Sequence, residues 1–359
     1  MGRILRFFMN LIMILLAVVI LAGGGLIGYL TVEEYRPQDR EQLTAAGKAS
    51  DSLSAGDSVS VMTWNIGYGG LSETADFFMD GGVSVRSQPQ DQVLANIDAV
   101  IRQLSDTDPD LICLQEIDRN SDRSFNHDQT GMLADAMQDY VFCFANNFRV
   151  PFIPYPFPPM GKVDSGIMTM SRFDVGEAER IALPCPFSWP VRIANLKRCL
   201  LVTRIPVGDS SRSLVLVNAH LEAYDDGSGK EAQTAMLREV IEAEYEKGNY
   251  VIVTGDFNQS FSNIDTSAYP LRSPDLWQCG TLDTETFSDR WQFLMDTSAP
   301  TCRSLDRPYD GDREHFQFYM IDGFIVSDNL VVSSVETMDL GFANSDHNPV
   351  LLRVQLPEK

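Results

Sequence analysis

Positive charge is scarce in this sequence. Its 359 residues include 28 lysines and arginines against 50 aspartates and glutamates, a formal net charge of −22. Residues 1–32 carry +2 through Arg3 and Arg6, so residues 33–359 carry −24. Such a surface repels polyanions at long range and argues against tight, non-specific nucleic-acid binding, which depends on lysine and arginine. A nuclease is not excluded, because a bound divalent cation offsets the repulsion locally.

The sequence also lacks the cysteine patterns of a zinc site. It contains no CxxC motif and no zinc-type cysteine–histidine spacing. Cys113 lies in an apolar run and is expected in the core. In an oxidising compartment two local disulfides remain alternatives to free thiols, namely Cys185–Cys199 and Cys279–Cys302. Internal repeats and low-complexity blocks are absent as well.

Charge is missing altogether between Phe7 and Val32. That apolar run is long enough to span a bilayer as a helix. Basic residues precede it and Glu33 and Glu34 follow, which predicts a single-pass protein of the cell membrane with a cytoplasmic N-terminus and an extracytoplasmic remainder. A cleaved signal peptide is the alternative, but its apolar core is shorter and ends at a small-x-small site. We therefore assign residues 1–32 to a membrane anchor.

The remaining chain divides into a polar segment and one domain. Residues 33–57 show little apolar periodicity and predict a tether. From residue 58 to 359, short apolar runs alternate with amphipathic stretches at 92–104, 131–140 and 232–247. This alternation predicts one α/β catalytic domain of layered strands and helices. The stretch 150–160 contains five prolines, which exclude it from helix or sheet interiors, and we predict either a packed loop or an exposed apolar lip.

Six polar clusters adjoin apolar runs along this domain. We interpret each run as a buried strand that carries a polar group at its end. The clusters centre on Asn65, Glu116, His220, Asp256 with Asn258, Asp322, and Asp346 with His347. Carboxylates, amides and imidazoles that converge in this way suit a hard metal ion and a phosphate. Each cluster taken alone is more typical of a turn or a solvated loop, so the prediction rests on their combination.

Individual residue types suggest individual tasks. Glu116 supplies the hard oxygen that Mg²⁺ prefers. Asp256 and Asn258 are two apart in an extended segment, so both side chains face one side. Asp322 is suited to hydrogen-bond an imidazole and fix its tautomer. His127, in a polar and loop-like stretch, is a further candidate on the substrate side.

The clusters, in this order, resemble the endonuclease/exonuclease/phosphatase superfamily, the deoxyribonuclease-I-like proteins, over about residues 59–356. The resemblance implies an α/β four-layer sandwich, with two mixed β-sheets packed face to face and helices outside. It also implies metal-assisted hydrolysis of a phosphoester by activated water. By position it implies metal ligands at Glu116, Asn65 and Asp346, catalytic residues at His220, Asp256, Asn258, Asp322 and His347, and a phosphate contact from Asn258. It leaves open which histidine is the acid and which the base.

Departures from the family pattern affect the substrate. In the deoxyribonucleases an arginine that contacts DNA closely follows the glutamate, whereas here Ile117 and Asp118 intervene before Arg119. A carboxylate partner for His220 is not evident. We therefore expect a monomeric, membrane-anchored phosphoesterase that uses Mg²⁺, with Mn²⁺ as an alternative. A lipid head group or small phosphodiester is favoured over nucleic acid. The alternatives are an extracytoplasmic nuclease acting on DNA or RNA, and a non-catalytic binding module.

Overall fold

Two seven-stranded sheets form the body of the protein. The computed structural model describes residues 2–86 and 88–358. The first sheet has the strand order β1 (Arg40–Leu43), β7 (Glu177–Ala182), β8 (Cys199–Pro206), β9 (Ser213–His220), β10 (Tyr250–Asp256), β16 (Asp322–Ser327) and β13 (Trp291–Leu294). The second has the order β17 (Val331–Thr337), β18 (Val350–Gln355), β3 (Ser58–Asn65), β4 (Leu111–Asp118), β6 (Gly161–Ser171), β5 (Val141–Ile153) and β2 (Ala46–Gly47). Both sheets are mixed, because β9–β10 and β3–β4 are parallel and the other pairs antiparallel.

The remaining elements are shorter strands and the helices. Two small ladders pair β11 (Gln259–Phe261) with β12 (Gly280–Leu282) and β14 (Cys302–Arg303) with β15 (Phe318–Tyr319). The α-helices are α1 (Gly2–Val32), α2 (Gln90–Thr107), α3 (Gln129–Ala136) and α4 (Ser228–Glu246). Helices α2, α3 and α4 overlap the three amphipathic stretches found in the sequence. Helix α4 begins and ends close to its predicted bounds, whereas α3 ends earlier than predicted.

Alternating side chains divide the interior into layers. On β9, Leu214 and Leu216 face the space between the sheets, whereas Val215 and Val217 pack toward α4. This is the two-residue period of a strand whose two faces are both covered. On the second sheet, Val61 faces the first sheet and lies in the same cluster as Leu214 and Leu216. The predicted four-layer sandwich is therefore confirmed, with α4 outside one sheet and α2 and α3 outside the other.

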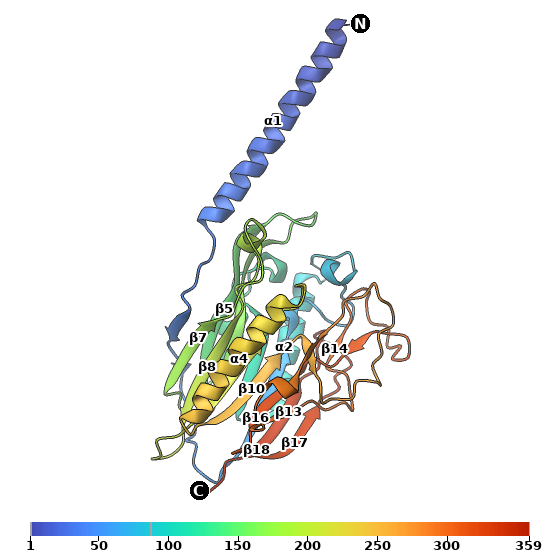
Figure 1. Ribbon diagram of the computed structural model, residues 1–359. Coiled ribbons are helices and arrows are strands. Elements are labelled where there is room, and N and C mark those ends of the chain that lie inside the picture. Colours follow the sequence, from blue (N-terminus) through green and yellow to red (C-terminus); the bar gives the residue numbers. More distant parts are fainter. Residues whose placement is uncertain (1, 87, 359) are drawn as a thin grey trace.

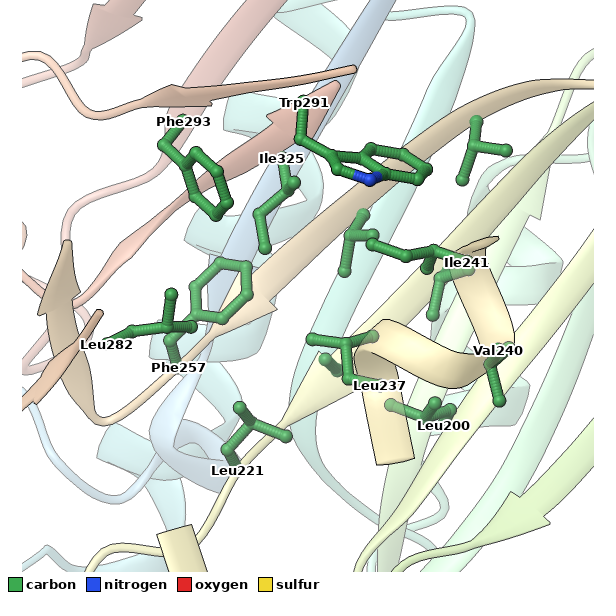
Figure 2. Close-up of a cluster of buried hydrophobic side chains, with 14 of the residues drawn as sticks. Leu200, Leu221, Leu237, Val240, Ile241, Phe257, Leu282, Trp291, Phe293 and Ile325 are labelled. Carbon is green, nitrogen blue, oxygen red and sulfur yellow. The ribbon is translucent and has the colours of Figure 1, made fainter. Parts of the chain in front are cut away.

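Helix α4 illustrates how an outer layer forms. Its apolar residues Leu237, Val240 and Ile241 recur at helical spacing and point to one side. Figure 2 shows them facing Trp291 and Ile325 of the first sheet. Burial of each such aliphatic side chain stabilises the fold by about 1.5–3 kcal/mol.

Helix α1 projects from one end of this body (Figure 1). It has 31 residues, is long and apolar enough to cross a membrane, and its most apolar stretch is fully exposed. Its C-terminal end joins the domain, where Leu30 packs with Phe148 and Ile193 and Leu26 packs against the same cluster. The helix agrees with the predicted span, while membrane insertion and orientation stay predictions.

The segment predicted to be a tether is not a free spacer. Within residues 33–57, β1 pairs with β7 and β2 pairs with β5, so the segment extends the edges of both sheets. Glu34 is buried and bound by Arg36, Arg192 and Lys197. Its polar composition suggested solvation, but backbone pairing to an open edge does not require apolar side chains.

Two further expectations are corrected. The proline-rich stretch was excluded from sheet, yet β5 continues to Ile153 through Pro151, which lies where the register shifts between Val150 and Ile153. A bulge leaves a residue unpaired, so proline is tolerated there. All six cysteines are free, and neither proposed disulfide is present.

Candidate active site

Four of the predicted residues lie near the carboxyl ends of parallel strand pairs. Asn65 ends β3 beside Gln115 of β4, and Glu116 follows at a register shift. In the other sheet, His220 and Asp256 are the last paired residues of β9 and β10. Parallel neighbours deliver their carboxyl ends to the same edge. The sheets face each other, so one edge gathers side chains from both, and Asn65 Nδ2 donates to Asp256 Oδ2 at 3.1 Å.

The other residues reach this edge from the opposite chain direction. Asp322 begins β16 rather than ending a strand, and Asp346 and His347 precede β18. The sequence interpretation of a strand that ends in each cluster is wrong for these three. They still reach the site because β16 is antiparallel to β10 and β18 is antiparallel to β3, which pairs Asp322 with Asp256.

The backbone around the site is unusual. Glu116 and Asn258 have φ of 55° and 52°, a left-handed conformation that is uncommon for residues other than glycine. Gly255 precedes Asp256, and a Cβ there would collide with the carbonyl oxygen of Ala219. A glycine is thus required where β10 approaches β9. Backbone strain of this kind is retained where the surrounding fold fixes it, and it concentrates at functional sites.

His347 is held by a carboxylate. Its Nδ1 lies 2.8 Å from Oδ2 of Asp322, and both side chains are buried. Burial alone would lower the pKa of His347, but the nearby charges of Asp322 and Asp346 raise that pKa well above its usual value. The predicted carboxylate–histidine dyad is therefore present in geometry, and the neighbouring carboxylates favour the cationic imidazole.

His220 has the opposite electrostatic environment. Burial, followed by the charges of Arg198 and His347, lowers its pKa well below the usual value. Its Nε2 lies 3.5 Å from Asp256 Oδ2, while its buried Nδ1 has no hydrogen-bond partner among the described residues. Its surroundings therefore favour the neutral imidazole. The carboxylate contact that the sequence did not reveal is Asp256 at Nε2, and no carboxylate binds Nδ1 within the described part of the chain.

Two carboxyl groups of the site, those of Asp256 and Asp346, are buried in surroundings that disfavour their charged forms. Burial raises the pKa of Asp256 to about 6, with a further contribution from Asp322. Burial also raises the pKa of Asp346 to about 6, and the charge of Glu116 adds to the effect. Buried acids with raised pKa values are typical of functional sites, where a cation or a substrate completes the charge balance.

The donor atoms fit a hard divalent cation. Two groups of side chains each bring their potential ligand atoms within 4.8 Å of one another. They are Cys302–Asp346–His347 and Asp256–Asp322–His347. Neither is a convincing ligand set as it stands. Asp322 occupies Nδ1 of His347, and burial raises the pKa of Cys302 to about 12, so its thiol is neutral. Carboxylate oxygens from Glu116 and Asp346, both on the same cleft, remain as suitable ligands.

Asn65 is held in place by hydrogen bonds beside the cleft, and its predicted role as a metal ligand stays a prediction. Its Oδ1 accepts from Gly67 N at 3.0 Å, and its Nδ2 donates to Glu116 and Asp256. Asn65 thus orients two carboxylates from behind the cleft. Asn258 lines the cleft, with its Nδ2 held by the carbonyl of Leu221 at 2.9 Å.

The site opens into one large cleft of about 520 Å³. Its polar end contains Glu116, His220, Asp256, Asn258, Asp346 and His347. Its other end is apolar, with Phe77, Phe148, Ile153, Met160, Phe187 and Leu196 among its lining residues. His127 does not line the cleft. It hydrogen-bonds Gln90 at 3.0 Å, so the structure does not support its predicted contact with substrate.

Sequence reasoning missed several residues near the centre. Arg123, Arg198 and Arg303 line the cleft, although the chain as a whole is strongly acidic. At the mouth, Tyr224 Oη donates to Asp80 at 3.1 Å. Burial raises the pKa of Asp80 to about 7. These side chains come from short elements and loops between the long strands, and only the tertiary structure brings them together.

A buried amide bridge beneath the site was also missed. Gln115 Nε2 donates to Asn218 Oδ1 at 2.9 Å, and Asn218 Nδ2 donates to the carbonyls of Leu114 and Met168. The bridge joins the two sheets one residue before Glu116 and two before His220. In the sequence, the clusters of Glu116 and His220 each include a second polar residue inside the apolar run, and this pattern could have indicated the bridge.

Comparison with known proteins agrees with this geometry. A model of the Endonuclease/Exonuclease/phosphatase family matches residues 62–347, a range that includes all eight predicted catalytic and metal-binding positions. No curated protein matches the chain.

Solved structures share the fold at low identity. An endonuclease/exonuclease/phosphatase from Beutenbergia cavernae DSM 12333 is 18% identical with a TM-score of 0.56, over 84% of this chain and 72% of the other. Truncated TDP2 from Caenorhabditis elegans is 16% identical with a TM-score of 0.50, over 83% and 97%. The human Nocturnin catalytic domain, with bound sulfate, is 15% identical with a TM-score of 0.50, over 87% and 96%. At these identities the likeness concerns the fold.

Proposed function

Because the chain belongs to the endonuclease/exonuclease/phosphatase family, we propose that it is a membrane-anchored, divalent-metal-dependent phosphoester hydrolase. Members of this family generally hydrolyse phosphoester bonds. One observation carries the proposal for this chain. Two imidazoles lie close to Oδ2 of the buried Asp256, His220 at 3.5 Å and His347 at 3.8 Å, and their surroundings shift their pKa values in opposite directions.

Glu116 and Asp346 would hold the cation, Mg²⁺ by preference and Mn²⁺ as an alternative. Both supply hard carboxylate oxygens on the cleft surface. When bound, the cation offsets the charge of the phosphate and polarises its ester bond. Asn65 donates to Glu116, which keeps the carboxylate oriented toward the cleft.

The remaining residues divide proton transfer and charge stabilisation. Asp256, whose pKa is about 6, and the neutral His220 accept the proton of the attacking water. The cationic His347, fixed by Asp322, stabilises the negative charge that develops on the phosphate and the leaving oxygen. Asn258 contributes an amide contact to a phosphate oxygen. Opposite pKa shifts on the two histidines support this division of roles.

The proposed cellular location rests on helix α1, and the proposed substrate class rests on the surface charge and the cleft. Helix α1 would anchor the chain with a cytoplasmic N-terminus and an extracytoplasmic domain. The acidic surface disfavours nucleic acid, and the apolar end of the cleft favours a phosphoester that carries an apolar group, such as a lipid with its phosphate in the head group. We expect the enzyme to act as a monomer.

A hydrolysis assay tests this function. The full chain in detergent micelles is offered bis-p-nitrophenyl phosphate with Mg²⁺, Mn²⁺ or chelator, followed by lipid, DNA and RNA substrates. Wild type should hydrolyse the phosphodiester only with a cation, and Glu116→Gln should lose most turnover. Glu246→Gln is the matched control, because its carboxylate is exposed and binds Arg290 away from the cleft. Equal activity of wild type and Glu116→Gln, or activity that survives chelation, would refute the proposal.

A further inference from the structure

Two loops stand out at the end of the domain from which α1 projects. The first is the tip of the β5–β6 hairpin, residues 148–163, and the second is the β7–β8 loop, residues 183–198. In Figure 1 the green loop after β5 lies at the same end of the body as the base of α1. These two segments are called the membrane-proximal loops below.

The membrane-proximal loops expose large apolar side chains. Phe157 is 96% exposed, Tyr155 68%, Val191 58% and Trp189 55%. Outside α1, nine large apolar side chains are exposed among the described residues, and four of the nine belong to these loops. Contiguous apolar exposure of this kind marks a surface that contacts another phase or partner.

Both loops are fixed to the end of α1. Trp189 Nε1 donates to Thr31 Oγ1 at 3.1 Å, and Arg192 Nε donates to Glu34 at 2.9 Å. Leu30 of α1 packs with residues of both loops, Phe148 and Ile193. If α1 spans a bilayer, these contacts hold the exposed aromatic side chains at the height where the helix leaves the membrane. Tryptophan and tyrosine are enriched at that depth.

Charge separates these loops from the rest of the chain. The sequence contains 50 acidic residues, but neither 148–163 nor 183–198 includes one. The two segments contain five basic residues instead, listed as Arg149, Lys162, Arg192, Lys197 and Arg198. Arg192 and Lys197 bind Glu34, and the buried Arg198 binds Glu222, so Arg149 and Lys162 are the cations of these loops that can face an anionic lipid surface. The acidic remainder of the domain is repelled from such a surface.

The inner sides of the same loops form the apolar end of the catalytic cleft. Ile153 and Met160 line it from the first loop, and Phe187 and Leu196 line it from the second. The membrane-proximal loops therefore connect an exposed apolar surface with the cleft that contains Glu116 and His347.

We propose that the outer side of the membrane-proximal loops lies in the interfacial layer of the bilayer that holds α1, so that the cleft takes phosphoesters of membrane lipids directly from it. The inference rests on the proposed function and names its substrate class. The lipid acyl portion follows the apolar wall, while the head-group phosphate reaches the polar end. Membrane contact at the two loops adds a second attachment to the one that α1 supplies.

Tryptophan fluorescence tests the contact without any assay of activity. The chain has four tryptophans and α1 has none. Trp64 and Trp291 are buried, and Trp277 lies in the cleft. In the full chain reconstituted into phosphatidylcholine–phosphatidylglycerol vesicles, lipids brominated near the head group should quench the emission, and Trp189→Phe should remove most of that quenching.

A second position checks the other loop. In the Trp189→Phe background, Phe157→Trp should restore quenching, whereas Val331→Trp should not. Val331 is the matched control because it is also exposed, at 54%, but lies on β17. If Phe157→Trp is quenched no more than Val331→Trp, the membrane contact is refuted.

Activity separates this inference from the proposed function. Phe157→Ser with Trp189→Ser should lose about tenfold activity on a phospholipid within the vesicles, the loss expected from removing the burial of an aromatic side chain. The same variant should keep wild-type activity on soluble bis-p-nitrophenyl phosphate, and Val331→Ser should change neither. If wild type hydrolyses neither substrate, the proposed function fails. If it hydrolyses both and the double variant is unaffected on lipid, only the inference fails.

Discussion

Two buried charge clusters in this protein are built in opposite ways. At the catalytic centre, carboxyl groups outnumber the groups that compensate them, and burial raises the pKa of Asp256 and of Asp346 to about 6. At the base of α1, one buried carboxylate, Glu34, has three cationic partners, Arg36, Arg192 and Lys197. Burial opposes the charge of Glu34, but its hydrogen bonds to Arg192 and Arg36 outweigh that effect and lower its pKa.

The difference separates a structural cluster from a functional one. A compensated cluster stabilises the geometry of its own surroundings and requires nothing further. An uncompensated cluster costs folding free energy and is retained where a ligand completes it. The Glu34 cluster therefore fixes the domain to α1, whereas the catalytic cluster has the composition expected of a site for a cation and a phosphate. Substitutions in the two clusters should have opposite effects.

The largest effect should come from the cationic member of the catalytic cluster. His347→Asn removes the imidazolium that Asp322 holds at 2.8 Å, and it should lower kcat about 10²–10⁴-fold, the usual contribution of a positioned acid or base. The measurement is turnover of bis-p-nitrophenyl phosphate at saturating Mg²⁺. His315→Asn is the control, because His315 is exposed and contacts Asp312. Comparable losses in both variants would show that the dyad has no special role.

A cation should stabilise only the catalytic cluster. Mg²⁺ at about 100 times its Kd should raise the free energy of unfolding by about 2.7 kcal/mol, because it binds the folded state alone. Thermal unfolding in micelles, with and without chelator, measures this. Glu116→Gln should remove most of the shift, whereas Glu34→Gln should retain it in full. A shift that is equally large in Glu116→Gln would place the cation elsewhere.

Removing a carboxylate should stabilise the catalytic cluster when no metal is present. Asp346 is buried and accepts one weak hydrogen bond, from Ser345 at 3.4 Å. Asp346→Asn should raise the free energy of unfolding by about 3 kcal/mol at pH 7, because its pKa is raised from 3.8 to about 6 and each pKa unit corresponds to about 1.4 kcal/mol, while it lowers activity. Denaturant unfolding in the presence of chelator measures the change. A less stable Asp346→Asn protein would mean that this carboxylate is compensated after all.

The sequence predicts the strands and the edge where they meet better than the connections between them. Strand β9 was predictable because its alternating apolar residues are buried on both faces, and a polar His220 at its end is conspicuous against them. Asp322 and Asp346 were located correctly, but at the starts of strands, because residue order alone does not reveal chain direction. Pairing of β1 with β7 depends on the backbone and leaves no side-chain pattern. Arg123, Arg198 and Arg303 meet at the cleft through contacts between residues far apart in the sequence, which the sequence pattern does not reveal.

The smallest effect is expected at the Glu34 cluster. Glu34→Gln should lower the free energy of unfolding by about 1 kcal/mol at pH 7, since Arg36 and Arg192 are partly exposed and solvent screens them. The folded-state pKa of Glu34 is lower than its ordinary value of 4.5, so its contribution is complete above that value and is lost as the pH falls through the folded-state pKa. Wild type and Glu34→Gln should therefore differ in thermal unfolding at pH 7 and converge under acid conditions. A difference that persists at low pH would mean that the carboxylate acts through packing rather than charge, and the contrast with the catalytic cluster would then disappear.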